Sequence, residues 1–77
     1  MKTEFELRFE RAKKEIEEDI ESGLVPKDIK HFYDLDSYVD MNYYGGFIEE
    51  GYHLSENFEL EDQVQTALNE WLLNGRQ

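Results

Sequence analysis

The sequence has no cysteine, a single proline and no long run of apolar residues, and each of these shortages excludes a class of protein. Without cysteine, the chain can form neither a disulfide framework nor a thiolate metal site. No apolar stretch approaches the roughly 20 residues that a helix needs to cross a bilayer. The first residues, Met1 to Glu4, lack the apolar segment of a signal peptide. We therefore expect a soluble protein of the cytoplasm.

Basic residues are also scarce: eight lysines and arginines stand against 19 acidic residues, which gives a net charge of −11. This balance argues against direct binding to nucleic acid or to an anionic membrane, because both need a basic protein surface. It favours fast, salt-sensitive association with a positively charged partner. The alternative is that the acidity only keeps a small protein soluble.

The chain is long enough for one domain with a small core, which we expect to span residues 1–77. A chain of this size buries only about 60–65% of its unfolded surface. Five phenylalanines, five tyrosines and one tryptophan supply the bulk that such a core needs.

A helix is predicted between Thr3 and Ser22, with Thr3 as its N-cap and Gly23 as its stop. Its apolar residues recur every three or four positions, which is the period of one helix face. They are Phe5, Phe9, Ala12, Ile16 and Ile20.

A second long helix is predicted near the C-terminus, capped by Ser55 or Asn57 and closed by Gly75. The acids of its first turns suit the positive end of the helix dipole and need no functional explanation. Its apolar stripe consists of Leu60, Val64, Ala67, Leu68, Trp71 and Leu72.

The middle of the chain is predicted to form short helices. Apolar spacing indicates one over Lys27–Tyr33, and Asp34 can cap a second that turns Leu35, Tyr38 and Val39 inward. Whether these are two helices or one bent helix stays open.

The segment Asn42–Leu54 is predicted to be a loop around Gly45 and Gly46, where positive φ angles are expected. Aromatic residues on both sides of the glycines also allow a short hairpin there. The whole pattern predicts an all-α fold in which two longer terminal helices pack around short central helices and a glycine-rich loop.

The segment from Glu15 to Glu21 is the densest concentration of charge, with five carboxylates and no basic residue. It falls in the second half of the first predicted helix, where the dipole is negative and each anion costs roughly 0.3–1 kcal/mol at low salt. A chain shaped only for folding would place lysine or arginine there. We therefore predict contact with a basic partner, an ordinary solvated helix face being the alternative. The candidate contact residues are Glu15, Glu17, Glu18, Asp19 and Glu21.

No motif indicates a reaction, a cofactor or a metal. The stretch from Asp40 to Gly45 is similar to the start of an EF-hand loop. Position 5 of that loop would be Tyr44 and position 12 would be Gly51, so the bidentate glutamate is missing. No serine or threonine lies beside a histidine, and no glycine-rich phosphate loop precedes a helix. We expect a non-enzymatic protein without a metal ion or a cofactor.

Residues 32–46 resemble a recurrent segment of small acidic proteins encoded by phages and plasmids. The match is carried by Tyr38, Asp40, Asn42, Gly45 and Gly46. The resemblance implies a mobile-element origin and a stoichiometric role. Small acidic phage proteins commonly block host machinery, including CRISPR effectors and restriction enzymes.

Three functional hypotheses follow. The first is an inhibitor in the host cytoplasm that presents its acids to the basic, phosphate-binding surface of a host nucleic-acid-handling complex. The second is a small regulatory or adaptor protein that binds through an exposed aromatic patch at Tyr43 and Tyr44. The third, and the weakest, is a calcium-binding module around Asp40.

Overall fold

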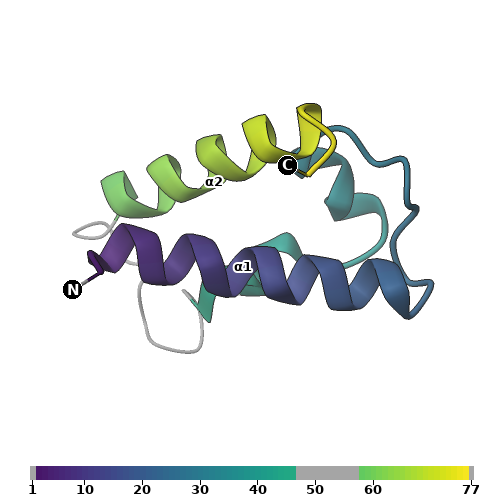
Figure 1. Ribbon diagram of the computed structural model, residues 1–77, viewed down its shortest axis with the longest axis horizontal. Helices are drawn as coiled ribbons and strands as arrows, with labels where there is room; N and C mark the ends of the chain where they lie inside the picture. Colours follow the sequence, from purple (N-terminus) through teal and green to yellow (C-terminus); the bar gives the residue numbers. More distant parts are fainter. Residues whose placement is uncertain (1, 47–57, 77) are drawn as a thin grey trace.

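Two α-helices, α1 (Glu4–Glu21) and α2 (Phe58–Leu73), pack side by side and run in the same general direction (Figure 1). The computed structural model describes residues 2–46 and 58–76. Within those two ranges, every regular element is helical and no strand occurs. The all-α prediction is therefore confirmed.

Both ends of α1 follow the local sequence. The Thr3 hydroxyl accepts a hydrogen bond from the Glu6 amide at 3.1 Å, and the Glu6 carboxylate accepts one from the Thr3 amide at 3.2 Å. This reciprocal capping box satisfies two amides that the helix itself leaves unpaired. At the other end Gly23 has φ +89°, and the Leu24 amide bonds to the Asp19 carbonyl at 3.0 Å. The predicted N-cap and glycine stop are both confirmed.

The core lies between the facing sides of α1 and α2 and is completed by the connecting segment. The predicted stripes are confirmed, except that Phe5, Phe9, Leu60 and Ala67 are only partly buried. The fully buried cluster consists of Ala12, Ile16, Ile20, Val25, Ile29, Phe32, Leu35, Tyr44, Val64, Leu68, Trp71 and Leu72.

The first short helix differs from the prediction in position and type. It is a 3-10 helix, η1 (Phe32–Ser37), and no helix covers Lys27–Tyr33. Asp34 lies inside the first turn of η1 instead of capping a second helix. The buried side chains Ile29, Phe32 and Leu35 are three residues apart, a spacing that a 3-10 helix accommodates as well as an α-helix does.

Of the three residues predicted to point inward from the second short helix, two contact the core and one does not. Leu35 is fully buried and Val39 packs partly against the core, but the Tyr38 side chain is 51% exposed. Tyr33 is likewise 52% exposed. Tyr33 directly follows the buried Phe32 within η1 and so points away from the buried face, and Tyr38 lies just past the end of η1, with φ −119° and ψ −40°.

The glycine-rich segment begins with η2 (Met41–Gly46), which consists of 3-10 turns joined at a kink. Tyr44 has extended backbone angles there, and Gly45 has φ +79°, as predicted. The remainder of the predicted loop or hairpin, and the caps Ser55 and Asn57, lie outside the described residues. Figure 1 shows η2 beside α1, to which it returns the chain after the turn through η1.

Candidate functional site

The five acids of the Glu15–Glu21 segment occupy the last two turns of α1, and that helix has no basic residue in its last turn. Glu17, Glu18 and Glu21 are exposed. Glu15 and Asp19 are half-buried on the side that faces η2. The structure therefore divides the predicted contact residues into an outward set of three and an inward pair.

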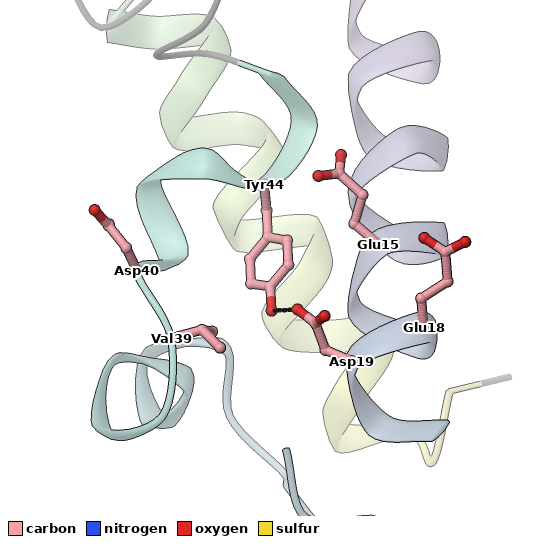
Figure 2. Close-up of a pocket in the computed structure, with 6 residues that line it drawn as sticks. All are labelled: Glu15, Glu18, Asp19, Val39, Asp40 and Tyr44. Atoms are coloured by element: carbon pink, nitrogen blue, oxygen red, sulfur yellow. Dashed lines mark hydrogen bonds between the residues drawn. The ribbon is translucent and has the colours of Figure 1, made fainter. Parts of the chain in front are cut away.

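The inward pair holds η2 against α1. The Tyr44 hydroxyl donates a hydrogen bond to Asp19 Oδ2 at 2.5 Å, which is the dashed line in Figure 2. The Gly45 amide donates to Glu15 Oε1 at 3.4 Å. Glu15 also lies 3.3 Å from Arg11 Nε, one turn earlier. Glu15 and Asp19 are therefore structural as well as acidic, a role that their spacing in the sequence does not disclose.

Arg8 supplies the third tether from α1 to η2. Its side chain is buried, donates to the Gly45 carbonyl at 3.0 Å, and pairs with the Glu4 carboxylate at 2.8 Å. The Gly45 peptide is thus held at its carbonyl by a cation and at its amide by the anion of Glu15. A buried arginine needs such partners, because an uncompensated buried charge is strongly destabilising.

Tyr44 is 5% exposed, so the predicted aromatic contact patch is wrong at this residue. Its ring is part of the core, and only its hydroxyl reaches a polar partner. Burial, followed by the hydrogen bond to Asp19, raises the pKa of this hydroxyl well above its usual value of 10.0. The group therefore stays a proton donor throughout the neutral range. The Tyr43 side chain lies outside the described part of the structure.

A pocket of about 330 Å³ lies between the second half of α1 and the segment that runs from Val39 to Tyr44. Figure 2 shows Glu15, Glu18 and Asp19 on the α1 side and Asp40 on the opposite rim. No lysine or arginine is among these described lining residues. The volume is near the lower end of the range for small-ligand sites, about 300–1,000 Å³. The charged groups among the pocket's described lining residues are all carboxylates.

Two exposed tyrosines, Tyr33 and Tyr38, were not among the predicted contact residues. A separate pocket of about 270 Å³ is lined by Tyr38, which does not line the first pocket. Apolar spacing could not have indicated the exposure of the two tyrosines, because the spacing of three between Phe32 and Leu35 fits an α-helix and a 3-10 helix alike, and Tyr38 continues it.

Within the described ranges, no group of three or more acidic or histidine side chains is placed to hold a metal ion. The region of Asp40 therefore offers no assembled calcium site among those residues. The proposed end of the calcium loop, Gly51, lies outside them.

Comparison with known proteins adds no relative, since the chain matches no family model, no curated protein and no solved structure. Among the described helices, neither is long and apolar enough to cross a membrane.

Proposed function

We propose that this protein is a stoichiometric, non-enzymatic inhibitor that binds the basic surface of a nucleic-acid-handling protein through the second half of α1. The observation that carries the proposal is the outward set, Glu17, Glu18 and Glu21, at the negative end of the helix dipole. None of the three forms an ion pair with a described residue.

The spacing of the charges supports mimicry of a phosphate backbone. Residues 15–21 rise about 9 Å along the helix, at 1.5 Å per residue. Because Glu15 and Asp19 face η2, the outward field comes from Glu17, Glu18 and Glu21, three charges over about 6 Å, which is comparable with the phosphate spacing of one DNA strand, about 3.4 Å. A protein surface built to neutralise phosphates would therefore find a comparable field along this part of α1.

The position of the acids separates this proposal from a role in solubility. Acids at the start of α2 lie where the dipole stabilises them, so folding alone accounts for them. Acids at the end of α1 oppose the dipole, and folding gains nothing from Glu17, Glu18 or Glu21. A binding role supplies the compensating advantage.

The resemblance of residues 32–46 to small acidic proteins of phages and plasmids suggests the class of partner. A defence protein such as a CRISPR effector or a restriction enzyme has a basic groove that binds nucleic acid. A mobile element benefits from blocking that groove, because the defence protein attacks its nucleic acid. The site of action would then be the cytoplasm of a bacterial host.

Affinity capture from a bacterial lysate, at low salt and then at high salt, tests the proposal. Wild-type protein is expected to retain a nucleic-acid-binding protein at low salt and release it at high salt, because exposed charges are screened. Reversal of Glu17, Glu18 and Glu21 to lysine should weaken the interaction at least tenfold. The recovered partner should also lose bound fluorescent duplex when wild-type protein is added.

The matched control reverses three exposed acids of α2, Glu59, Asp62 and Glu70, and so changes the net charge equally. This control variant should still capture the partner. Equal loss of binding in both triple variants would show that net charge alone matters and would contradict the proposal. Capture that is insensitive to salt would contradict it as well.

A further inference from the structure

The end of η1 and its connection to η2, residues 37–40, contribute to two pockets. Val39 and Asp40 line the pocket of about 330 Å³ that faces α1. Ser37 and Tyr38 line a separate pocket of about 270 Å³, together with residues of the segment that follows α1. We call residues 37–40 the corner.

The corner presents the Tyr38 ring on a fixed backbone. The amides of Tyr38 and Val39 both bond to the carbonyl of Leu35, each at 2.9 Å. Leu35 is fully buried and Val39 packs against the core, so the backbone on both sides of Tyr38 is anchored. The Tyr38 side chain nevertheless stays 51% exposed. An exposed aromatic residue on a rigid support is typical of a protein-binding hot spot.

The charges around Tyr38 indicate the chemistry of the partner. The pocket facing α1 has only carboxylates as charged groups among its described lining residues. The pocket beside Tyr38 is lined by Asp28 and Asp34, with Lys30 as its single base. A ring flanked by carboxylates complements a cation that is flat enough to stack on it. Arginine meets both requirements, because its guanidinium is planar, pairs with carboxylates through two hydrogen bonds and stacks on aromatic faces.

We infer that the corner is part of the partner interface, and that Tyr38, with the pocket that it lines and the acidic pocket lined by the next two residues, receives an arginine-bearing segment of a basic protein. The inference rests on the proposed function and narrows it. The acids of α1 would supply the long-range attraction, and Tyr38 would select arginine over lysine at close range. A bound lysine would make the same charge contacts with less stacking, since its ammonium is a compact, strongly hydrated point charge.

Two capped peptides, hexa-arginine and hexa-lysine, provide the test because they carry equal charge. Their affinities for the intact protein are measured by fluorescence anisotropy at low salt. Wild-type protein should bind hexa-arginine about two- to fivefold more tightly than hexa-lysine, as expected for stacking at an exposed site. Tyr38→Ala should abolish that preference, and Tyr38→Phe should keep it because the ring remains.

Tyr33→Ala is the matched control, since Tyr33 is as exposed as Tyr38 and lines neither pocket. This variant should retain the preference for arginine. A preference that survives Tyr38→Ala, or that Tyr33→Ala also removes, would overturn the inference. Equal, salt-sensitive binding of both peptides would overturn the inference too, but it would remain consistent with the proposed role of the acidic surface of α1. Failure of the proposed function would be distinguishable, as negligible binding of either peptide at low salt.

Discussion

At the scale of single residues, the hydrogen bond from Tyr44 to Asp19 joins the acidic segment to the core. The ring of Tyr44 is buried and its hydroxyl ends on a carboxylate of α1, so one side chain links an apolar cluster to a charged surface. This contact requires a protonated hydroxyl, because a phenolate would be repelled by the negative charges of Asp19 and Glu15. Folding therefore favours the protonated form of Tyr44.

This linkage predicts a loss of stability in alkali. The pKa of Tyr44 is higher in the folded protein than its unfolded value near 10.0. The protonated Tyr44 hydroxyl therefore contributes fully to folding stability below pH 10. This contribution is lost as the pH rises toward the pKa of Tyr44 in the folded protein. The free energy of unfolding should fall by up to about 1.4 kcal/mol per pH unit above pH 10 for this one proton. Urea unfolding between pH 8 and about pH 11 measures it.

Tyr44→Phe should remove most of that alkaline loss and cost about 1 kcal/mol at neutral pH, where it deletes one hydrogen bond. Tyr38→Phe is the control, because Tyr38 is exposed and should leave the alkaline slope unchanged. An unchanged slope in Tyr44→Phe would show that other groups cause the loss.

The sequence could not indicate these contacts. Asp19 lies 25 residues before Tyr44, and Arg8 lies 37 residues before the carbonyl that it binds. Short-range rules account for the pair of Arg8 with Glu4 at 2.8 Å, because the two residues are four apart on one helix, but such rules cannot place a distant loop against the same arginine. For the same reason they placed Tyr44 on the surface when it belongs to the core.

At the scale of elements, local chemistry predicted the long helices well and the short one poorly. Thr3, Glu6 and Gly23 define the ends of α1 through contacts within a few residues, so these ends could be located from the sequence. In η1, Phe32 and Leu35 are three apart, a spacing that an α-helix and a 3-10 helix share. Only contact with α2, where Asn69 accepts from the Phe32 amide at 3.2 Å, fixes where η1 begins.

Charge reversal at the C-terminal end of α1 and at the N-terminal end of α2 should change the free energy of unfolding in opposite directions. Glu21→Lys at the end of α1 should stabilise the protein by about 0.3–1 kcal/mol, because it replaces an unfavourable charge near the negative end of the dipole. Glu59→Lys in the first turn of α2 should destabilise it by a similar amount. Both residues are exposed, and both changes alter the net charge equally.

The difference in urea unfolding free energy between those two variants therefore isolates the dipole from overall repulsion. Effects of the same sign and size in both variants would mean that net charge, not position on the helix, governs stability. That result would also remove the argument that folding gains nothing from the acids at the end of α1.

At the scale of the whole molecule, a net charge of −11 on 77 residues makes self-repulsion a general cost of folding. Added salt screens this repulsion, because the Debye length falls from about 30 Å at 0.01 M to about 3 Å at 1 M. Salt should therefore favour the folded protein and oppose its association with a basic partner. These opposite dependences allow stability and binding to be separated in one series of measurements.

Thermal unfolding between 20 mM and 500 mM sodium chloride should show a rising Tm. A screening contribution of about 1 kcal/mol corresponds to an increase of about 4–8 °C for a domain of this size. The triple charge-reversal variant at Glu17, Glu18 and Glu21 is less negative, so its Tm should rise less with salt. A Tm that falls with salt would indicate that ion pairs such as the one between Arg8 and Glu4 outweigh the repulsion.

The three tethers from α1 to η2 have a consequence for the thermodynamics of association. Arg8, Glu15 and Asp19 fix the helix that carries the outward acids before any partner arrives. Little backbone entropy then remains to be lost on binding, and each ordered residue would otherwise cost about 1–2 kcal/mol. For the proposed basic partner, the acidic surface would therefore be preorganised, and part of the entropy cost of binding would already have been met during folding.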